Sequence, residues 1–77
     1  VMSIIPLEEL ERWYDKEYCI KKVKKDPYSI QFVRNQTEEI QRLAIQQDGS
    51  TIRYIDNPSE EVQRLAVQQN GYAIQYI

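Results

Sequence analysis

Apolar and polar positions recur at a fixed period along most of this chain. The segment from Tyr28 to Gly49 aligns without gaps on the segment from Ser50 to Gly71, and 11 of the 22 positions are identical. A third copy begins at Tyr72 and contains the first six residues of the pattern. Repetition at such a period is typical of architectures in which one structural unit stacks on the next.

Each copy predicts two helices, and the longer one follows a polar turn. Asn57, Pro58 and Glu60 are the residue types favoured at an N-cap, at the first helical position and in the first turn. Thr37 and Ser59 occupy equivalent positions in the two turns. Gly49 and Gly71 end the predicted helices, where a glycine commonly adopts the left-handed conformation.

The long helix is apolar on more than one side. Four residues at helical spacing form its main face: Val62, Leu65, Ala66 and Gln69. Val67 lies well away from that face, as does Ile45 in the preceding copy. Such a helix needs neighbours on several sides, which stacked repeats provide. The small residues Ala44 and Ala66 predict that adjacent helices approach closely.

A shorter helix is predicted over Ser50–Asp56, with counterparts over Pro27–Arg34 and Tyr72–Ile77. Ile52 and Ile55 are three positions apart and therefore lie on one side of it. A helix this short is marginal alone. We expect it to form because it packs against the longer helix.

The segment from Leu7 to Lys25 is interpreted as a degenerate repeat that starts after Pro6. Its charged residues suit the polar outer face of a terminal repeat. The predicted organisation is an N-terminal helical cap over residues 1–26, followed over residues 27–77 by two full repeats and the first helix of a third. The predicted fold class is all-α, an α-solenoid with a right-handed superhelix.

The residue composition narrows the function. The net charge of −2 disfavours generic binding to nucleic acid, although Lys21, Lys22, Lys24 and Lys25 cluster at a helix end. Histidine is absent and Cys19 is the single cysteine, so most hydrolytic mechanisms and thiolate metal sites lack their usual residues. Glu60 is better explained as an ion-pair partner of Arg64 than as a catalytic acid. We therefore predict a non-enzymatic protein with no cofactor, no metal and no catalytic residue.

No stretch of the sequence has the pattern of a signal peptide or a membrane span. The expected location is the cytoplasm, and no interaction with a membrane is predicted.

The motifs "AIQYI", "NPSEEVQ" and "LAVQQNG" resemble short helix-pair repeats of many bacterial and bacteriophage proteins of unknown function. They are also similar to a shortened HEAT or armadillo repeat, whose units are roughly twice as long. The resemblance covers the chain from Asp26 to Ile77. It implies a surface for protein binding, because repeats of this general kind usually serve that purpose, and it implies no catalytic residue.

Two sets of repeated residues are candidates for an interaction surface. A polar stripe, whose members recur at the repeat period, comprises Gln41, Arg42, Gln46, Gln63, Arg64 and Gln68. Its alternative explanation is recent duplication without selection for binding. An aromatic column comprises Phe32, Tyr54 and Tyr76, which either pack between units or face a ligand.

A third candidate is the C-terminal end of the stack. Val67, Ile74, Tyr76 and Ile77 would contribute exposed apolar area there, and two chains could cover it by meeting around a two-fold axis. The predicted function is protein–protein interaction with an unidentified protein partner, with homodimer formation through this end. The alternative is binding of single-stranded nucleic acid along the polar stripe.

Overall fold

The computed structural model describes residues 11–77, and every regular element in that range is a helix. Helices of α and 3₁₀ type alternate along it: α2 Lys16–Lys25, η1 Pro27–Phe32, α3 Glu38–Gln47, η2 Gly49–Tyr54, α4 Glu60–Gln69 and η3 Gly71–Tyr76. The prediction of an all-α chain is confirmed. The shorter helices were expected, but their 3₁₀ geometry was not.

The elements repeat with the period seen in the sequence. The α-helices begin at Lys16, Glu38 and Glu60, one repeat period apart, and the 3₁₀ helices that follow them keep the same spacing. We call each α-helix with the 3₁₀ helix that follows it a unit: unit 1 is residues 16–32, unit 2 is residues 38–54 and unit 3 is residues 60–76.

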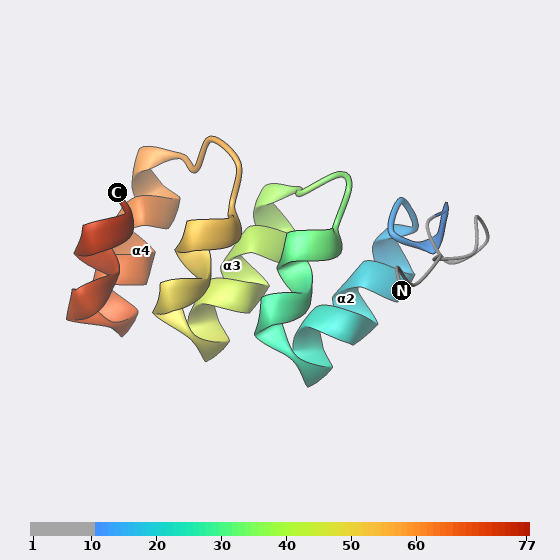
Figure 1. Cartoon of the computed structure of the whole chain (residues 1–77), viewed down its shortest axis with the longest axis horizontal. Helices are drawn as coiled ribbons and strands as arrows, with labels where there is room; N and C mark the ends of the chain where they lie inside the picture. The colour runs from blue at the N-terminus through green and yellow to red at the C-terminus, as the bar shows by residue number, and fades with distance from the viewer. Residues whose placement is uncertain (1–10) are drawn as a thin grey trace, which may run out of the picture.

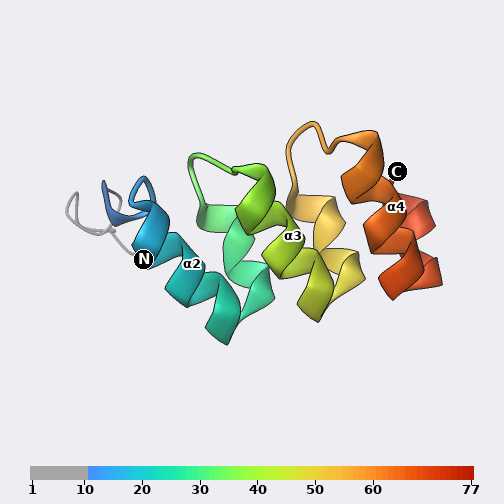
Figure 2. The ribbon, with the colours of Figure 1, turned by 180° about the vertical axis from the view of Figure 1, so that it is seen from behind.

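The three units lie side by side in chain order. Figure 2 shows α2, α3 and α4 as one row of helices. Figure 1, from the opposite side, shows the 3₁₀ helices as a second row in front of the first. The helix α3 contacts both α2 and α4, and α3 and α4 each contact the 3₁₀ helix of the preceding unit. The molecule is therefore two layers thick, and each unit packs against its neighbours in the chain.

The N-terminal helix differs from the prediction. The predicted start after Pro6 lies outside the described residues. Within them, a turn interrupts the expected continuous helix, and α2 begins at Lys16. Asp15 is the N-cap, and its carboxylate accepts a hydrogen bond of 3.0 Å from the backbone N–H of Glu17. An aspartate immediately before the helix satisfies N–H groups that have no partner within the helix.

The predicted N-cap at Asn57 is wrong by two positions. Ser59 caps α4 by accepting a hydrogen bond from Val62 N at 3.2 Å, and Thr37 caps α3 in the same way. Asn57 instead adopts a left-handed conformation with φ of 46°. Proline disfavours the helical region for the residue before it, and asparagine tolerates the left-handed region. The turn before Pro58 therefore continues to Ser59.

The predicted left-handed glycines are also wrong. Among residues 11–77 no glycine has a positive φ, and Gly49 and Gly71 are instead the first residues of η2 and η3. Asp48, in extended conformation, is both the C-cap of α3 and the N-cap of η2. Its carboxylate accepts a hydrogen bond of 3.0 Å from the backbone N–H of Ser50. Asp26 and Asn70 act in the same way in the other units. An Asx side chain thus replaces the expected glycine cap.

The core lies between the two rows of helices and runs through all three units. Its buried apolar side chains are Cys19, Val23, Ile30, Val33, Ile40, Ala44, Ile45, Ile52, Ile55, Val62, Ala66 and Ala73. The expected burial of Ile52 and Ile55 on one side of the short helix is confirmed, as is the expected burial of the alanines. No side-chain polar atom buried in the described residues lacks a hydrogen bond.

Glutamine side chains join successive α-helices. The side chain of Gln47 donates to the carbonyl of Val23 at 2.8 Å, and that of Gln69 donates to the carbonyl of Gln46 at 2.9 Å. Carbonyl oxygens in the last turn of a helix accept no hydrogen bond from within that helix. A side-chain donor from the next unit therefore stabilises them. The repeated glutamines therefore have a structural purpose.

A tyrosine joins units 1 and 2. The hydroxyl of Tyr28 donates to Asp48 Oδ2 at 2.6 Å and lies 2.9 Å from Ser50 Oγ. The hydrogen bond from Tyr28, followed in size by that from Ser50, lowers the pKa of Asp48. The hydrogen bond with Asp48 raises the pKa of Tyr28. Tyr72 occupies the same position in unit 3, where it is exposed to solvent.

We predict that Tyr28→Phe lowers the free energy of unfolding by about 1 kcal/mol, the usual net value of a hydrogen bond. Tyr72→Phe, the matched control, should leave it unchanged. Urea denaturation followed by circular dichroism measures both. Equal effects of the two substitutions would contradict this role for Tyr28.

The effect of Tyr28→Phe should depend on pH. A depressed pKa at Asp48 contributes stability above its ordinary value of 3.8, and that stability is lost as the pH falls through the lower folded value. The difference between wild type and Tyr28→Phe should therefore be full at neutral pH and narrow below pH 3.8. A difference that stays constant on acidification would show that Asp48 is not the partner responsible.

Candidate interaction surfaces

The polar stripe lies on the outer side of the α-helix row. Arg42, Gln46, Arg64 and Gln68 line shallow grooves between successive α-helices. The groove between α2 and α3 has a volume of about 320 Å³, and that between α3 and α4 about 230 Å³. A groove of this kind therefore recurs between each pair of neighbouring α-helices in the described residues.

Two members of the predicted stripe are not exposed to solvent as expected, because their side chains form hydrogen bonds within the chain. Gln41 is buried and donates to the carbonyl of Gln36 at 3.1 Å. Gln63 is half-buried and donates to the carbonyl of Pro58 at 3.0 Å. Both side chains close the turn that precedes their own helix. Both repeats thus have a glutamine at this position for a structural reason. The spacing of residues in the sequence could not distinguish this reason from a role in binding.

The arginines of the stripe are paired with carboxylates. Arg42 contacts Glu61 of the next unit at 2.7 Å and Glu38 of its own helix at 3.1 Å. The hydrogen bond with Glu61, followed in size by that with Glu38, raises the pKa of Arg42. Arg64 pairs with Glu60 at 3.5 Å. The glutamates largely neutralise the positive charge that a phosphate backbone would need.

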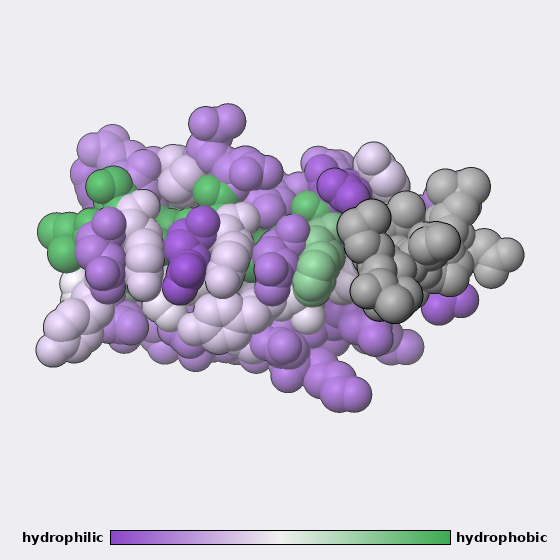
Figure 3. Space-filling view, viewed as in Figure 1, coloured by the Kyte–Doolittle hydropathy of each residue, from purple (hydrophilic) through white to green (hydrophobic). Residues whose placement is uncertain are grey.

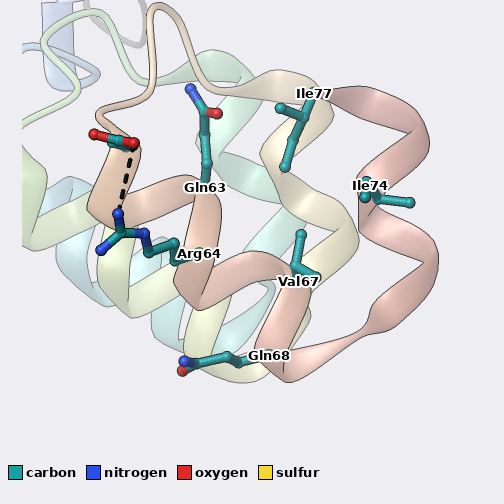
Figure 4. Close-up of a pocket in the computed structure, with 7 residues that line it drawn as sticks. Gln63, Arg64, Val67, Gln68, Ile74 and Ile77 are labelled. Atoms are coloured by element: carbon teal, nitrogen blue, oxygen red, sulfur yellow. Dashed lines mark ion pairs between the residues drawn. The ribbon is translucent and has the colours of Figure 1, made fainter.

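The C-terminal end of the stack carries a groove with a mainly apolar lining. It has a volume of about 390 Å³ and is lined by Glu60, Gln63, Arg64, Val67, Gln68, Ile74 and Ile77. Figure 4 shows the side chains of Val67, Ile74 and Ile77 around this groove, contributed by α4 and the end of the chain. In Figure 3 apolar surface gathers at the same end of the molecule. We call this surface the end face.

The isoleucines of the end face are exposed to solvent. Ile74 is 65% exposed and Ile77 is 55% exposed. The side chains one repeat period earlier, Ile52 and Ile55, are only 2% and 7% exposed, and α4 lies beside η2. The difference comes from the neighbour, since the residue types are the same.

The aromatic column is partly packed and partly exposed. Phe32 is about half exposed and its ring centroid lies 5.4 Å from that of Trp13. The guanidinium carbon of Arg53 lies 5.0 Å from the ring centroid of Tyr54 and 5.2 Å from that of Tyr76. Arg53 therefore links the tyrosines of units 2 and 3 by cation–π contacts. Arg53 was not among the predicted site residues.

The N-terminal unit presents different chemistry. Lys21, Lys22, Lys24 and Lys25 are all exposed near the end of α2, as expected for a solvated helix end. Cys19 is buried, and its thiol donates to the carbonyl of Trp13 at 3.2 Å. Burial, followed by the charge of Asp15, raises the pKa of this thiol. A raised pKa keeps the thiol protonated, which opposes nucleophilic reactivity.

Among residues 11–77, no three His, Cys, Asp or Glu side chains come together in a way that could hold a metal ion. None of the helices in that same range has the length and apolar character needed to cross a membrane.

Comparison with known proteins gives one family match. The model of a family described as a domain of unknown function (DUF4116) matches residues 15–59. This range begins at the N-cap of α2 and ends at the N-cap of α4, so it comprises units 1 and 2 with the turns that follow them. No curated protein and no solved structure matches the chain.

The two glycines provide a test of how the units are covered. A Cβ added to Gly49 would lie 2.5 Å from the backbone carbonyl oxygen of Ala66, whereas one added to Gly71 would meet nothing within 4 Å. Gly49→Ala should therefore lower the free energy of unfolding by roughly 1–3 kcal/mol, as overpacking does. Gly71→Ala should leave it unchanged or raise it slightly.

Thermal and urea denaturation of the two variants measure this difference. If both substitutions lower the free energy of unfolding equally, the inference that α4 closely approaches Gly49 would be wrong.

Proposed function

The chain belongs to the family described as a domain of unknown function (DUF4116), and we propose that it is a short α-solenoid that acts as a protein-interaction module. In this proposal its units are relatives in architecture of HEAT and armadillo repeats, with a shorter period. The module carries out no chemical reaction.

The solenoid part of the proposal is supported by the register of the units. Equivalent helices begin one repeat period apart, and the main contacts between elements join members of one unit or of adjacent units. Such nearest-neighbour packing is the defining property of solenoids. The polar contacts between units obey the same rule, as with Gln47 to Val23 and Gln69 to Gln46.

The interaction part rests on one observation, the exposed end face. Ile74 of η3 and Ile77, which follows η3, are more than half exposed beside a groove with a mainly apolar lining. Exposed apolar patches rimmed by polar residues commonly mark sites where another protein binds. Here the rim is formed by Arg64, Gln68 and Glu60.

Binding of single-stranded nucleic acid is the rival function. It requires unpaired cationic groups along the strand and side chains that reach the bases. The ion pairs of Arg42 and Arg64, and the internal hydrogen bonds of Gln41 and Gln63, occupy the side chains that would have to serve. We therefore favour a protein partner.

Site-specific cross-linking tests the function. A photo-reactive amino acid at position 74, on the end face, should cross-link a defined protein in a lysate of the source cells. The same group at position 72, which is 81% exposed but lies outside the groove, is the matched control and should not.

A parallel measurement uses retention on a single-stranded oligonucleotide column. We expect no retention at physiological salt. Retention that falls steeply with salt, together with cross-linking that is equal at positions 72 and 74, would overturn the proposal in favour of nucleic-acid binding.

A further inference from the structure

The last two residues of each 3₁₀ helix lie along one side of the stack and form a surface that we call the 3₁₀ face. Its members are Gln31, Phe32, Arg53, Tyr54, Gln75 and Tyr76. In every unit a polar residue precedes an aromatic one. Tyr54 is half-buried, and the other members are exposed. Figure 3, with the 3₁₀ helices in front, shows strongly hydrophilic side chains alternating with weakly hydrophilic or apolar ones along this row.

Arg53 lies between two rings of the 3₁₀ face. Its guanidinium carbon is 5.0 Å from the ring centroid of Tyr54 and 5.2 Å from that of Tyr76, so cation–π attraction orders the side chain. No carboxylate among residues 11–77 forms an ion pair with it, whereas Arg42 and Arg64 are both paired with glutamates. A guanidinium that stacks on a ring keeps the N–H groups at its edge free to donate. Arg53 is therefore an ordered cation that is available to a ligand.

The glutamines of the 3₁₀ face are also held in place. The side chain of Gln31 donates to the carbonyl of Tyr28 at 3.1 Å, and that of Gln75 donates to the carbonyl of Tyr72 at 3.1 Å. Each of these hydrogen bonds uses one N–H of the side-chain amide, so the second N–H remains free to donate. The 3₁₀ face thus alternates aromatic rings with positioned hydrogen-bond donors.

The period of the stack matches the pitch of a polyproline II helix. Neighbouring helices pack with their axes about 8–10 Å apart, so equivalent side chains of adjacent units have a similar separation. A polyproline II chain advances about 3.1 Å per residue with three residues per turn, which is about 9 Å per turn. One turn therefore spans one unit, and every third residue of the chain meets an equivalent ring.

The chemistry of a proline-rich segment fits the same surface. Proline has no N–H, so its backbone offers carbonyl oxygens, which the guanidinium of Arg53 and the glutamine amides can satisfy. Proline rings pack on aromatic side chains, and the preformed polyproline II conformation limits the entropy lost on binding. A carboxylate within the segment would complement the charge of Arg53.

We propose that the 3₁₀ face binds a proline-rich segment of a partner protein, with prolines on the aromatic rings and a carboxylate on Arg53. This site is separate from the end face and goes beyond the function proposed above. Arg53 and Tyr54 belong to unit 2, which has a neighbouring unit on either side, so their accessibility does not depend on an end of the stack. Single-stranded nucleic acid fits less well, because its phosphates need a series of cations and Arg53 is the one cation of this face.

Titration with a short peptide tests the inference. The probe is a blocked peptide of nine residues, one polyproline II turn for each unit, with eight prolines around a central glutamate. A second probe carries lysine in place of the glutamate. The control peptide keeps the glutamate and replaces the prolines by alternating glycine and serine, which gives a flexible chain.

The readout is the ¹H–¹⁵N spectrum of the labelled protein. We expect saturable shifts centred on η1, η2 and η3 with the glutamate probe, and no saturable shift with the control peptide. Arg53→Gln, which makes unit 2 resemble its neighbours, should weaken the glutamate probe about twofold to fivefold and remove its advantage over the lysine probe.

Two tyrosines of η3 provide a matched pair of variants. Tyr76→Ser removes a ring of the 3₁₀ face and should weaken binding about fivefold, the usual effect of losing an aromatic contact. Tyr72→Ser removes a ring that is 81% exposed outside the face, and it should leave the affinity unchanged. Circular dichroism of both variants checks that the helices remain folded.

Three results would refute the inference: no saturable shift with the glutamate probe at millimolar concentration, equal binding of the flexible control, and equal effects of Tyr72→Ser and Tyr76→Ser. Saturable shifts at the same residues with oligothymidylate, but not with the proline peptide, would make the occupant a nucleic acid. If the proline peptide fails while cross-linking at position 74 still captures a protein, the interaction function stands and this second site is wrong.

Discussion

The structure depends on one constraint: no unit encloses its own apolar side chains. Ile52 of η2 is buried, and α4 of the next unit lies against η2. Burial of a large aliphatic side chain is worth about 1.5–3 kcal/mol, so each unit is stabilised mainly by its neighbours. The ion pair from Arg42 to Glu61, the hydrogen bond from Gln69 and the absence of a Cβ at Gly49 all serve that same contact.

Much of the fold could be predicted from the sequence because the repeat is explicit. The repeat period and the helical spacing predicted the α-helices and the burial of Val62 and Ala66 correctly, whereas Gln69, assigned to the same face, is exposed. The cap positions were not predictable in detail, since Asn57 and Ser59 are both good N-caps and the choice depends on the conformation before Pro58. The glycines were misread because a helix-ending glycine and a glycine needed for close packing look identical in a sequence.

The candidate surfaces were less predictable than the fold. Repetition of Gln41 and Gln63 carries no information about whether a side chain faces solvent or closes a turn, and the structure shows the latter. Ile74 and Ile77, which the repeat pattern placed at the C-terminal end of the stack, are exposed there in the structure.

The most direct test of the account appends a second copy of residues 56–77 after Ile77 and measures amide hydrogen exchange in η3. In the original chain we expect the Ala73 amide, which donates to the Asn70 carbonyl as the Thr51 amide donates to the Asp48 carbonyl, to exchange faster than the Thr51 amide. In the extended chain a new α-helix covers η3, so the protection of Ala73 should rise to that of Thr51. Unchanged, rapid exchange at Ala73 in the extended chain would contradict the claim that each unit is completed by the α-helix of the next.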